Sequence, residues 1–347
     1  MQGGTAIAGL SPVVIPVFVS NLGCPHRCIF CDQRQFSPPV KPEEIPPLVD
    51  SFLAGCRHPD RRRRVLGFFG GSFTGLKPDL LEAYLAVTRD LIDRGRIHAA
   101  KASTRPDMVS TEVLNLLRRA GFEELEIGVQ SMDDTVLEAS MRGHTSSNST
   151  RAAELIKASG MRLGVQLMPG LPGEDIESFR LTVDASLRMN PDTARIYPVV
   201  VLRGTKLEDL FMRGEYRPLS LDEALRRALY AKIRLESRGC TILRMGLPQA
   251  PGLNVSAGPF HPSFGFLVRA RAYEMMAARA VGILGQGCII DVNPRDVPEL
   301  VGYRRETVQR YGFLYSFQET LPRGTIRANA ASESTCIQLQ DILEYIL

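Results

Sequence analysis

The sequence predicts an α/β fold, a partial (β/α)6 barrel followed by a small C-terminal α+β segment. Six short, nearly continuous apolar runs alternate with longer helical patterns between residues 13 and 246, as expected for parallel strands that are covered on both faces. After Gly246 this alternation gives way to a Pro- and Gly-rich passage. The six predicted strands are residues 13–20, 65–69, 98–104, 124–129, 161–168 and 193–199.

Helix boundary signals support this division. Ser220 and Glu223 form an S-x-x-E capping box at the start of one helical pattern, and glycines follow several others where a helix is expected to end. We place a boundary near Pro251, which divides the chain into a core of residues 1–250 and a C-terminal α+β domain of residues 251–347. The predicted helices are residues 79–94, 111–120, 152–159, 175–189 and 221–238.

Composition indicates an ordinary globular protein. The 347 residues are 44% hydrophobic, and the formal net charge of +4 neither requires nor excludes a polyanionic partner such as RNA. No stretch approaches the roughly 20 apolar residues of a membrane-spanning helix, and the first ten residues lack the charged and apolar regions of a signal peptide. We therefore expect a cytoplasmic protein without a membrane partner.

Three of the seven cysteines, Cys24, Cys28 and Cys31, fall within eight residues directly after the first predicted strand. This C-x3-C-x2-C spacing can hold three corners of a [4Fe-4S] cluster, and the absence of a fourth nearby cysteine leaves one iron open to a cofactor or substrate. Zinc is the alternative, but structural zinc usually takes four ligands from paired knuckles, so His26 would have to take part. The other cysteines are isolated, and we expect them to be small buried residues: Cys56, Cys240, Cys288 and Cys336.

Glycines and polar residues follow the other predicted strands. Because the carboxyl ends of parallel strands meet at one edge of the sheet, we expect these residues to form a ligand pocket beside the cysteines. Gly70 and Gly71 would let backbone groups approach a ligand closely, although a tight turn explains them equally well. Each polar residue taken alone is more often an ordinary loop residue. The polar residues expected at this edge are Ser72, Ser103, Arg105, Gln130, Gln166 and Tyr197.

The cysteine motif, with Phe30 before its last cysteine, resembles the cluster motif of the radical S-adenosylmethionine (SAM) superfamily. This resemblance implies a partial radical SAM barrel. Further segments resemble, in the same order, the radical SAM domain of the catalytic subunit of Elongator. A more distant resemblance is to oxygen-independent coproporphyrinogen oxidases. The segments that resemble the Elongator subunit are residues 103–107, 126–133, 142–145, 168–173 and 195–216.

The resemblance implies a reaction and a set of SAM contacts. A cluster reduced by a one-electron donor such as a ferredoxin or flavodoxin would cleave SAM and yield a 5′-deoxyadenosyl radical. Gly70 and Gly71 would bind the SAM amino group, and Arg142 would pair with its carboxylate, for which a guanidinium is well suited. Gln130 and Gln166 would line the ribose side. Ser103 stands where relatives often carry a carboxylate.

The substrate stays open. The Elongator subunit modifies the wobble uridine of tRNA, and the arginines at residues 61–64 and 304–305 are candidate phosphate contacts, although charge runs are more often solvated surfaces. We expect no acetyl-CoA, because the chain ends too soon to contain an acetyltransferase domain.

Two further hypotheses compete with RNA modification as the function of this chain. One is a small-molecule radical oxidase or decarboxylase, in which Arg203 and Arg244 hold substrate carboxylates. The other is a metal-binding module without turnover. His261 is a candidate acid or base at the barrel mouth, although a loop histidine more often has no such role.

Overall fold

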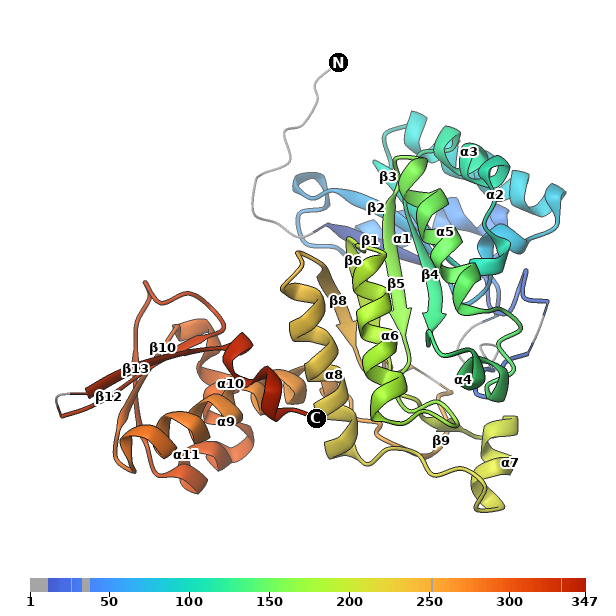
Figure 1. Cartoon of the computed structure of the whole chain (residues 1–347). Helices are drawn as coiled ribbons and strands as arrows, with labels where there is room; N and C mark the ends of the chain where they lie inside the picture. Colours follow the sequence, from blue (N-terminus) through green and yellow to red (C-terminus); the bar gives the residue numbers. More distant parts are fainter. Residues whose placement is uncertain (1–11, 26, 33–37, 251, 332) are drawn as a thin grey trace.

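The computed structural model describes residues 12–25, 27–32, 38–250, 252–331 and 333–347. Its centre is a curled, seven-stranded parallel sheet in the order β1-β2-β3-β4-β5-β6-β8 (Figure 1). The predicted fold class and all six predicted strands are confirmed. The strands are β1 (Val13–Phe18), β2 (Arg64–Phe69), β3 (Ala99–Thr104), β4 (Phe122–Gln130), β5 (Arg162–Leu167), β6 (Thr193–Ile196) and β8 (Thr241–Met245).

The seventh strand, β8, was not predicted. Among the described strands it pairs with β6 alone, and it forms one edge of the sheet. Thr241, Leu243 and Arg244 are exposed there, so the strand lacks the continuous apolar run that marks strands covered on both faces. Its position at the edge explains why the sequence pattern did not reveal it.

Helices pack against the outer face of the sheet (Figure 1). The capping box of Ser220 and Glu223 is present at the start of the last of them. The helix predicted at residues 152–159 already begins at Ser146, because Thr145 and Asn148 form a capping box there. The helices are α1 (Ile45–Ala54), which was not predicted, α2 (Pro78–Asp93), α3 (Thr111–Arg119), α5 (Ser146–Ala158), α6 (Ile176–Arg188) and α8 (Leu221–Glu236), with short α4 (Asp134–Ala139) and α7 (Lys206–Met212) at the carboxyl edge.

The two faces of the sheet differ in chemistry. On the outer face, aliphatic side chains such as Ile15 and Val17 are fully buried under the helices. On the inner face, the guanidinium of Arg195 on β6 lies 4.6 Å from the ring centroid of Phe69 on β2. Four strand spacings separate β2 from β6, roughly 19 Å in a flat sheet. The contact therefore requires the sheet to curl around its inner face.

A second, smaller sheet follows in the order β11-β10-β12-β13. Helix α9 (Phe264–Leu284) packs against this sheet and against α8 (Figure 1), which confirms the predicted C-terminal α+β segment. None of the described helices is long and apolar enough to cross a membrane. The other elements here are β10 (Ile289–Val292), α10 (Val297–Val301), α11 (Glu306–Tyr311), β11 (Leu314–Phe317), β12 (Thr325–Ala330) and β13 (Glu333–Gln338).

The domain boundary near Pro251 stays a prediction. Pro251 itself lies outside the described residues. Directly after it, β9 (Val255–Ala257) returns to the barrel and pairs with β7 (Val201–Leu202) in a two-stranded sheet. The chain therefore contacts the barrel once more before it enters α9.

A buried ion pair fixes the loop after β5 to helix α8. The Glu174 side chain is fully buried, and its carboxylate accepts the backbone N–H of Gly170 (2.6 Å) and a guanidinium N–H of Arg227. Burial raises the pKa of Glu174 to about 7, although Gly170 and Arg227 act in the opposite direction. The folded protein therefore binds a proton at Glu174 more tightly than the unfolded chain does.

We expect Glu174→Gln to change how stability depends on pH. Because the folded state has the higher pKa, protonation of Glu174 stabilises the folded wild type. This stabilisation is complete below the ordinary pKa of a glutamate and is lost as the pH rises through about 7. The variant cannot titrate at this position. Its free energy of unfolding relative to wild type should therefore increase by about 2 kcal/mol between pH 5 and pH 8, as measured by urea unfolding. The control Glu215→Gln removes a carboxylate whose pKa is lowered. Its difference from wild type in free energy of unfolding should therefore stay constant between pH 5 and pH 8.

Candidate functional site

The cysteine loop, described at residues 19–25 and 27–31, follows β1 and lies against the loop after β2. Two backbone hydrogen bonds join them. The N–H of Asn21 donates to the carbonyl of Gly70, and the N–H of Ser72 donates to the carbonyl of Leu22, both at 2.8 Å. Because β1 and β2 are parallel neighbours, the two loops leave the sheet at the same edge and can pair in this way.

Two glycines permit this close approach. A Cβ on Gly71 would lie 2.6 Å from the carbonyl oxygen of Leu22. A Cβ on Gly23, where φ is +69°, would overlap the carbonyl oxygen of Ser72. The predicted close approach at Gly71 thus involves the protein's own cysteine loop.

The other side of the cysteine loop is held by α4 and α7. The N–H of Ile29 donates to the carbonyl of Ser140 (3.3 Å), and the carbonyl of Ile29 accepts the N–H of Leu207 (2.9 Å). Ile29 and Phe30 are buried in a hydrophobic cluster with residues of α4, β7 and α7. Sequence reasoning missed this support, because no local pattern links residues so far apart in the chain.

Cationic groups surround the cysteine sulfurs. Cys28 is buried, and its Sγ accepts an N–H from Arg142 at 3.0 Å. The pKa of the Cys24 thiol is raised overall by burial and by the neighbouring Cys28, and Arg105 and Arg142 oppose this only in part. Nearby guanidinium groups stabilise thiolates, the form in which cysteine binds metal.

The three cysteines do not converge on one point. Among the described residues, no three His, Cys, Asp or Glu side chains are grouped so that they could hold a single metal ion. His26, which the zinc alternative requires, lies outside the described residues. In a cubane cluster each cysteine binds a different iron, so the cysteines need not converge as the ligands of one ion do.

Arg142 connects the cysteines to the ends of β4 and β5. Its second terminal nitrogen donates to the carbonyl of Gly128 (2.8 Å), and Gln166 Nε2 donates to the side-chain oxygen of Gln130 (3.2 Å). A Cβ on Gly128 would lie 2.6 Å from Gln130 Nε2 and 3.2 Å from Arg142, so the glycine makes room for both. These residues lie together at one edge, and their roles toward a cofactor stay a prediction.

Ser72 and Arg105 are engaged by the protein itself. The Ser72 hydroxyl lies 2.9 Å from that of Thr104 and accepts the N–H of Arg105 at 3.2 Å. The guanidinium of Arg105 is buried and makes two 3.0 Å hydrogen bonds to the carboxylate of Asp107. Both residues hold the loops after β2 and β3 in place beside the cysteines.

Ser103 leads to a carboxylate that sequence analysis did not single out. Its hydroxyl donates to Glu126 on β4 (2.7 Å), which also accepts an N–H from Arg195 on β6 (2.9 Å). Gly164 on β5 lies between them, and a Cβ there would be 3.0 Å from the Glu126 Cβ. The missing side chain lets Glu126 reach across β5. Acidic residues at alternate positions 124 and 126 of a predicted strand were the sequence signal that could have indicated a charged face of the sheet.

Buried polar atoms without partners gather beside the cysteines. Of the nine such side-chain atoms among the described residues, seven belong to residues 20–21 and 140–149. They include Nε of Arg142 and the ring nitrogens of His144, which have no partner of good hydrogen-bond geometry although the backbone of Val129 lies close enough to act on the imidazole. Burial, with help from Arg142 and Arg105, lowers the pKa of His144 to about 3, so its imidazole is neutral and can donate and accept. Such atoms are costly unless a ligand or water satisfies them, and they fit a ligand such as the amino-acid part of SAM.

The isolated cysteines differ in burial. Cys240 and Cys288 are buried as predicted, and Cys56 is partly buried. The prediction is wrong for Cys336, which is exposed. It lies on β13 at the edge of the small sheet, where its neighbour Ile337 points inward, and successive side chains of a strand point to opposite faces.

Other candidate residues have local partners. At the amino edge of the sheet, opposite the cysteine loop, Arg63 pairs with Glu123 and Arg64 pairs with Asp60. His261 uses its Nδ1 to accept the N–H of Ser263 (3.0 Å) near the start of α9. Arg304 stacks on the neighbouring Tyr303 ring at 5.1 Å. None of these contacts points to a ligand.

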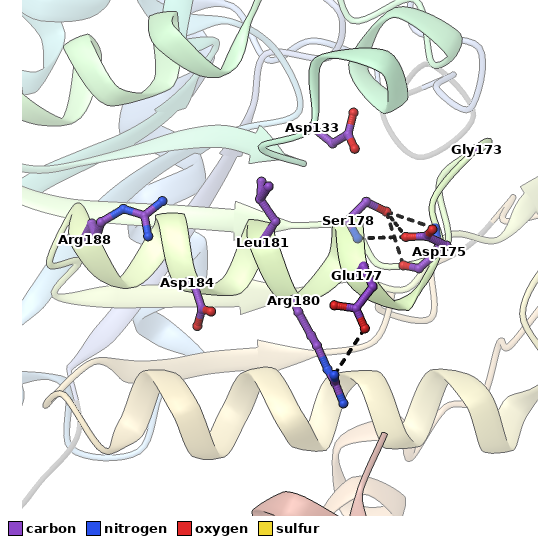
Figure 2. A pocket seen from close by; sticks show the side chains of 9 residues that line it. All are labelled: Asp133, Gly173, Asp175, Glu177, Ser178, Arg180, Leu181, Asp184 and Arg188. Atoms are coloured by element: carbon purple, nitrogen blue, oxygen red, sulfur yellow. Dashed lines mark hydrogen bonds and ion pairs between the residues drawn. The ribbon is translucent and has the colours of Figure 1, made fainter.

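A groove of about 720 Å³ runs along the exposed side of α6 (Figure 2). It contains none of the predicted site residues. Its polar groups serve the helix: Asp175 caps α6 through Ser178, and Glu177 pairs with Arg180 (3.2 Å). The groove is therefore separate from the candidate site.

Comparison with known proteins identifies the family. A model of the radical SAM superfamily matches residues 19–185, and a model of the Radical_SAM C-terminal domain matches residues 191–274. The chain belongs to the radical SAM superfamily. The solved archaeal Elp3 of Methanocaldococcus infernus, with an N-terminal deletion, shares this radical SAM fold at a TM-score of 0.56 and 21% identity, over 74% of this chain and 61% of that one.

Three curated relatives confirm the resemblances predicted from sequence. The tRNA uridine(34) acetyltransferase of Methanocaldococcus jannaschii is 28% identical, over 63% of this chain and 48% of its own length. Elongator complex protein 3 of Bos taurus is 35% identical, over 67% and 44%. Heme chaperone HemW of Bacillus subtilis is 26% identical, over 55% and 52%. This radical SAM chain spans about half the length of these relatives.

We expect Gly23→Ala to prevent stable docking of the cysteine loop, and Gly95→Ala is its matched control. The two glycines have similar left-handed backbones, with φ of +69° and +65°, so both substitutions incur about 1 kcal/mol of backbone strain. Only at Gly23 would a Cβ overlap other atoms, because nothing lies within 4 Å at Gly95. After anaerobic reconstitution, the Gly23 variant should lose most of its iron and sulfide, and the Gly95 variant should keep wild-type amounts. Equal contents would contradict this account.

Proposed function

We propose that the chain is a radical SAM enzyme in which Cys24, Cys28 and Cys31 hold a [4Fe-4S] cluster. The observation that supports it is a single loop of three cysteines, packed beside Arg142 and a group of buried polar atoms without partners. This donor set fits a cluster with one open iron and a polar cofactor beside it. When bound, the cluster and SAM together supply methionine and a 5′-deoxyadenosyl radical, which takes hydrogen from a substrate.

Residues at the carboxyl edge of the sheet bind SAM and orient it beside the cysteine loop. Arg142 contacts Cys28 and Gly128, and its unpaired Nε–H is available for the SAM carboxylate. The backbone of Gly70, Gly71 and Ser72 takes the amino group. The amide pair of Gln130 and Gln166 takes the ribose, and Ser103 and Arg105 hold the neighbouring strand ends through Glu126 and Asp107. The hydrophobic cluster around Ile29 and Phe30 keeps water from the cysteine loop.

The proposed substrate is tRNA, and the proposed electron source is a one-electron reductant such as a ferredoxin or flavodoxin. Two of the relatives named above support an RNA substrate, because one is a tRNA uridine(34) acetyltransferase and the other is an Elongator protein. The proposal covers the SAM-dependent step only and assigns no role to acetyl-CoA. A small-molecule oxidase or decarboxylase remains the competing function.

We expect the anaerobically reconstituted protein to release 5′-deoxyadenosine when given dithionite and SAM. Cys28→Ser should abolish release and cluster absorbance, because it removes one of three thiolate ligands. Cys336→Ser is the matched control, since it removes an exposed thiol far along the chain, and it should behave as wild type. A brown wild-type protein that releases no 5′-deoxyadenosine would favour a metal-binding module without turnover.

Arg142→Lys should weaken SAM binding about tenfold, or about 1.4 kcal/mol. Lysine keeps the charge but loses the planar group of N–H donors that contacts Cys28, Gly128 and the proposed SAM carboxylate. Equilibrium dialysis with labelled SAM on cluster-loaded protein measures the change. The control Arg94→Lys alters an exposed arginine at the end of α2. Equal SAM affinities of the two variants would show that Arg142 does not contact SAM.

A further inference from the structure

Arg244 is an exposed cation on the inner face of the barrel. It lies on β8 in register with Arg195 on β6, and directly paired residues on neighbouring strands extend from the same face. Arg195 is held by Glu126 (2.9 Å) and lies over the Phe69 ring. Arg244 has no ion-pair partner in the part of the chain that the structure describes.

The inner face carries more positive than negative charge. Among the described residues its two carboxylates, Glu124 and Glu126, are already engaged, and Arg244, beside the like-charged Arg195, has no carboxylate partner. Like charges directly opposite each other repel, so this edge of the sheet favours an incoming anion. Glu124 is shared by Lys101 (3.3 Å) and Arg162 (3.5 Å), and Glu126 pairs with Arg195 (2.9 Å), so with Arg244 four cations face two carboxylates.

Tyr197 adds a hydrogen-bond donor two residues after Arg195, a spacing that places both on the same face of an extended strand. Its N–H donates to the carbonyl of Leu167 (2.8 Å), which continues the pairing of β5 and β6 toward the carboxyl edge. Its hydroxyl makes no hydrogen bond to another described residue. Burial raises the pKa of Tyr197, partly opposed by Arg195 and Arg244, so the hydroxyl keeps its proton.

This place is open to solvent and close to the proposed SAM site. Because β8 is the edge strand, Leu243 is 41% exposed and Arg244 is exposed as well. On the inner side, Arg195 is in register with Gln166, which we assign to the ribose of SAM. A substrate whose anionic group binds at Arg244 would therefore lie no more than two strands away from the proposed SAM site at Gln166.

We propose that Arg244 and Tyr197 bind a backbone phosphate of the RNA substrate. This inference rests on the proposed function. A guanidinium binds phosphate oxygens through two parallel N–H donors, and a tyrosine hydroxyl adds a third. An exposed edge strand suits a phosphate carried by a large molecule, whereas small carboxylate substrates are normally enclosed in a pocket.

The test is the salt dependence of tRNA binding. Fluorescence anisotropy measures the affinity of cluster-loaded protein with SAM for an unmodified tRNA transcript across a salt series. We expect Arg244→Gln to weaken binding three- to tenfold and to lower the slope of log K against log salt by about 0.7–0.9, the effect of one lost phosphate contact. Arg244→Lys should keep the slope, because it keeps the charge, and Tyr197→Phe should lower affinity without changing the slope.

Arg94→Gln is the matched control. It removes another exposed arginine, paired with Asp90 (2.8 Å), from the end of α2 at the amino edge of the sheet. The inference is overturned if this control loses as much affinity as Arg244→Gln, if the slope of Arg244→Gln equals that of wild type, or if Arg244→Gln loses SAM binding to the same extent. Wild-type protein that releases 5′-deoxyadenosine but binds no tRNA overturns this inference and the proposed tRNA substrate, and leaves the proposed radical SAM chemistry in place. Wild-type protein that releases none overturns the proposed function.

Discussion

The backbone contact between the cysteine loop and the loop after β2 determines where the candidate site can form. Peptide groups buried at such a junction must find partners, and they do so by pairing across the two loops at Asn21 with Gly70 and at Leu22 with Ser72. Side chains at Gly23 or Gly71 would hold the loops apart. The positions of the three cysteines relative to the strand ends follow from this pairing.

A second contact makes the cysteine loop rigid from the opposite side. Helix α7 donates the Leu207 N–H to Ile29, and β7 is paired with β9, which comes from the beginning of the C-terminal segment. The side chains between these elements form a hydrophobic cluster of their own. The cysteine loop is therefore enclosed between the barrel edge and a cover built from residues about 170 positions later in the chain.

The inner face of the barrel is stabilised by ion pairs rather than by apolar packing. Buried carboxylates are costly unless neighbouring cations and hydrogen bonds satisfy them. Glu124 and Glu126 meet this requirement through Lys101, Ser103 and Arg195. Such an interior leaves polar groups directed toward the carboxyl edge, where we propose that the cofactor and the substrate bind. The outer face, by contrast, is closed by aliphatic side chains under the helices.

Local pattern was enough to predict much of this protein. The apolar runs and the capping box at Ser220 identified six strands and a helix start, because strand burial and capping act over a few neighbouring residues. The spacing of Cys24, Cys28 and Cys31 indicated the radical SAM superfamily, which the family comparison confirms, and the cluster on these cysteines stays a prediction. Only the tertiary structure showed that Glu126 reaches Arg195 across Gly164, that α7 covers Ile29, and that Cys336 faces outward. These features depend on the curl of the sheet and on which strand lies at its edge, and both are set by contacts between segments far apart in the chain.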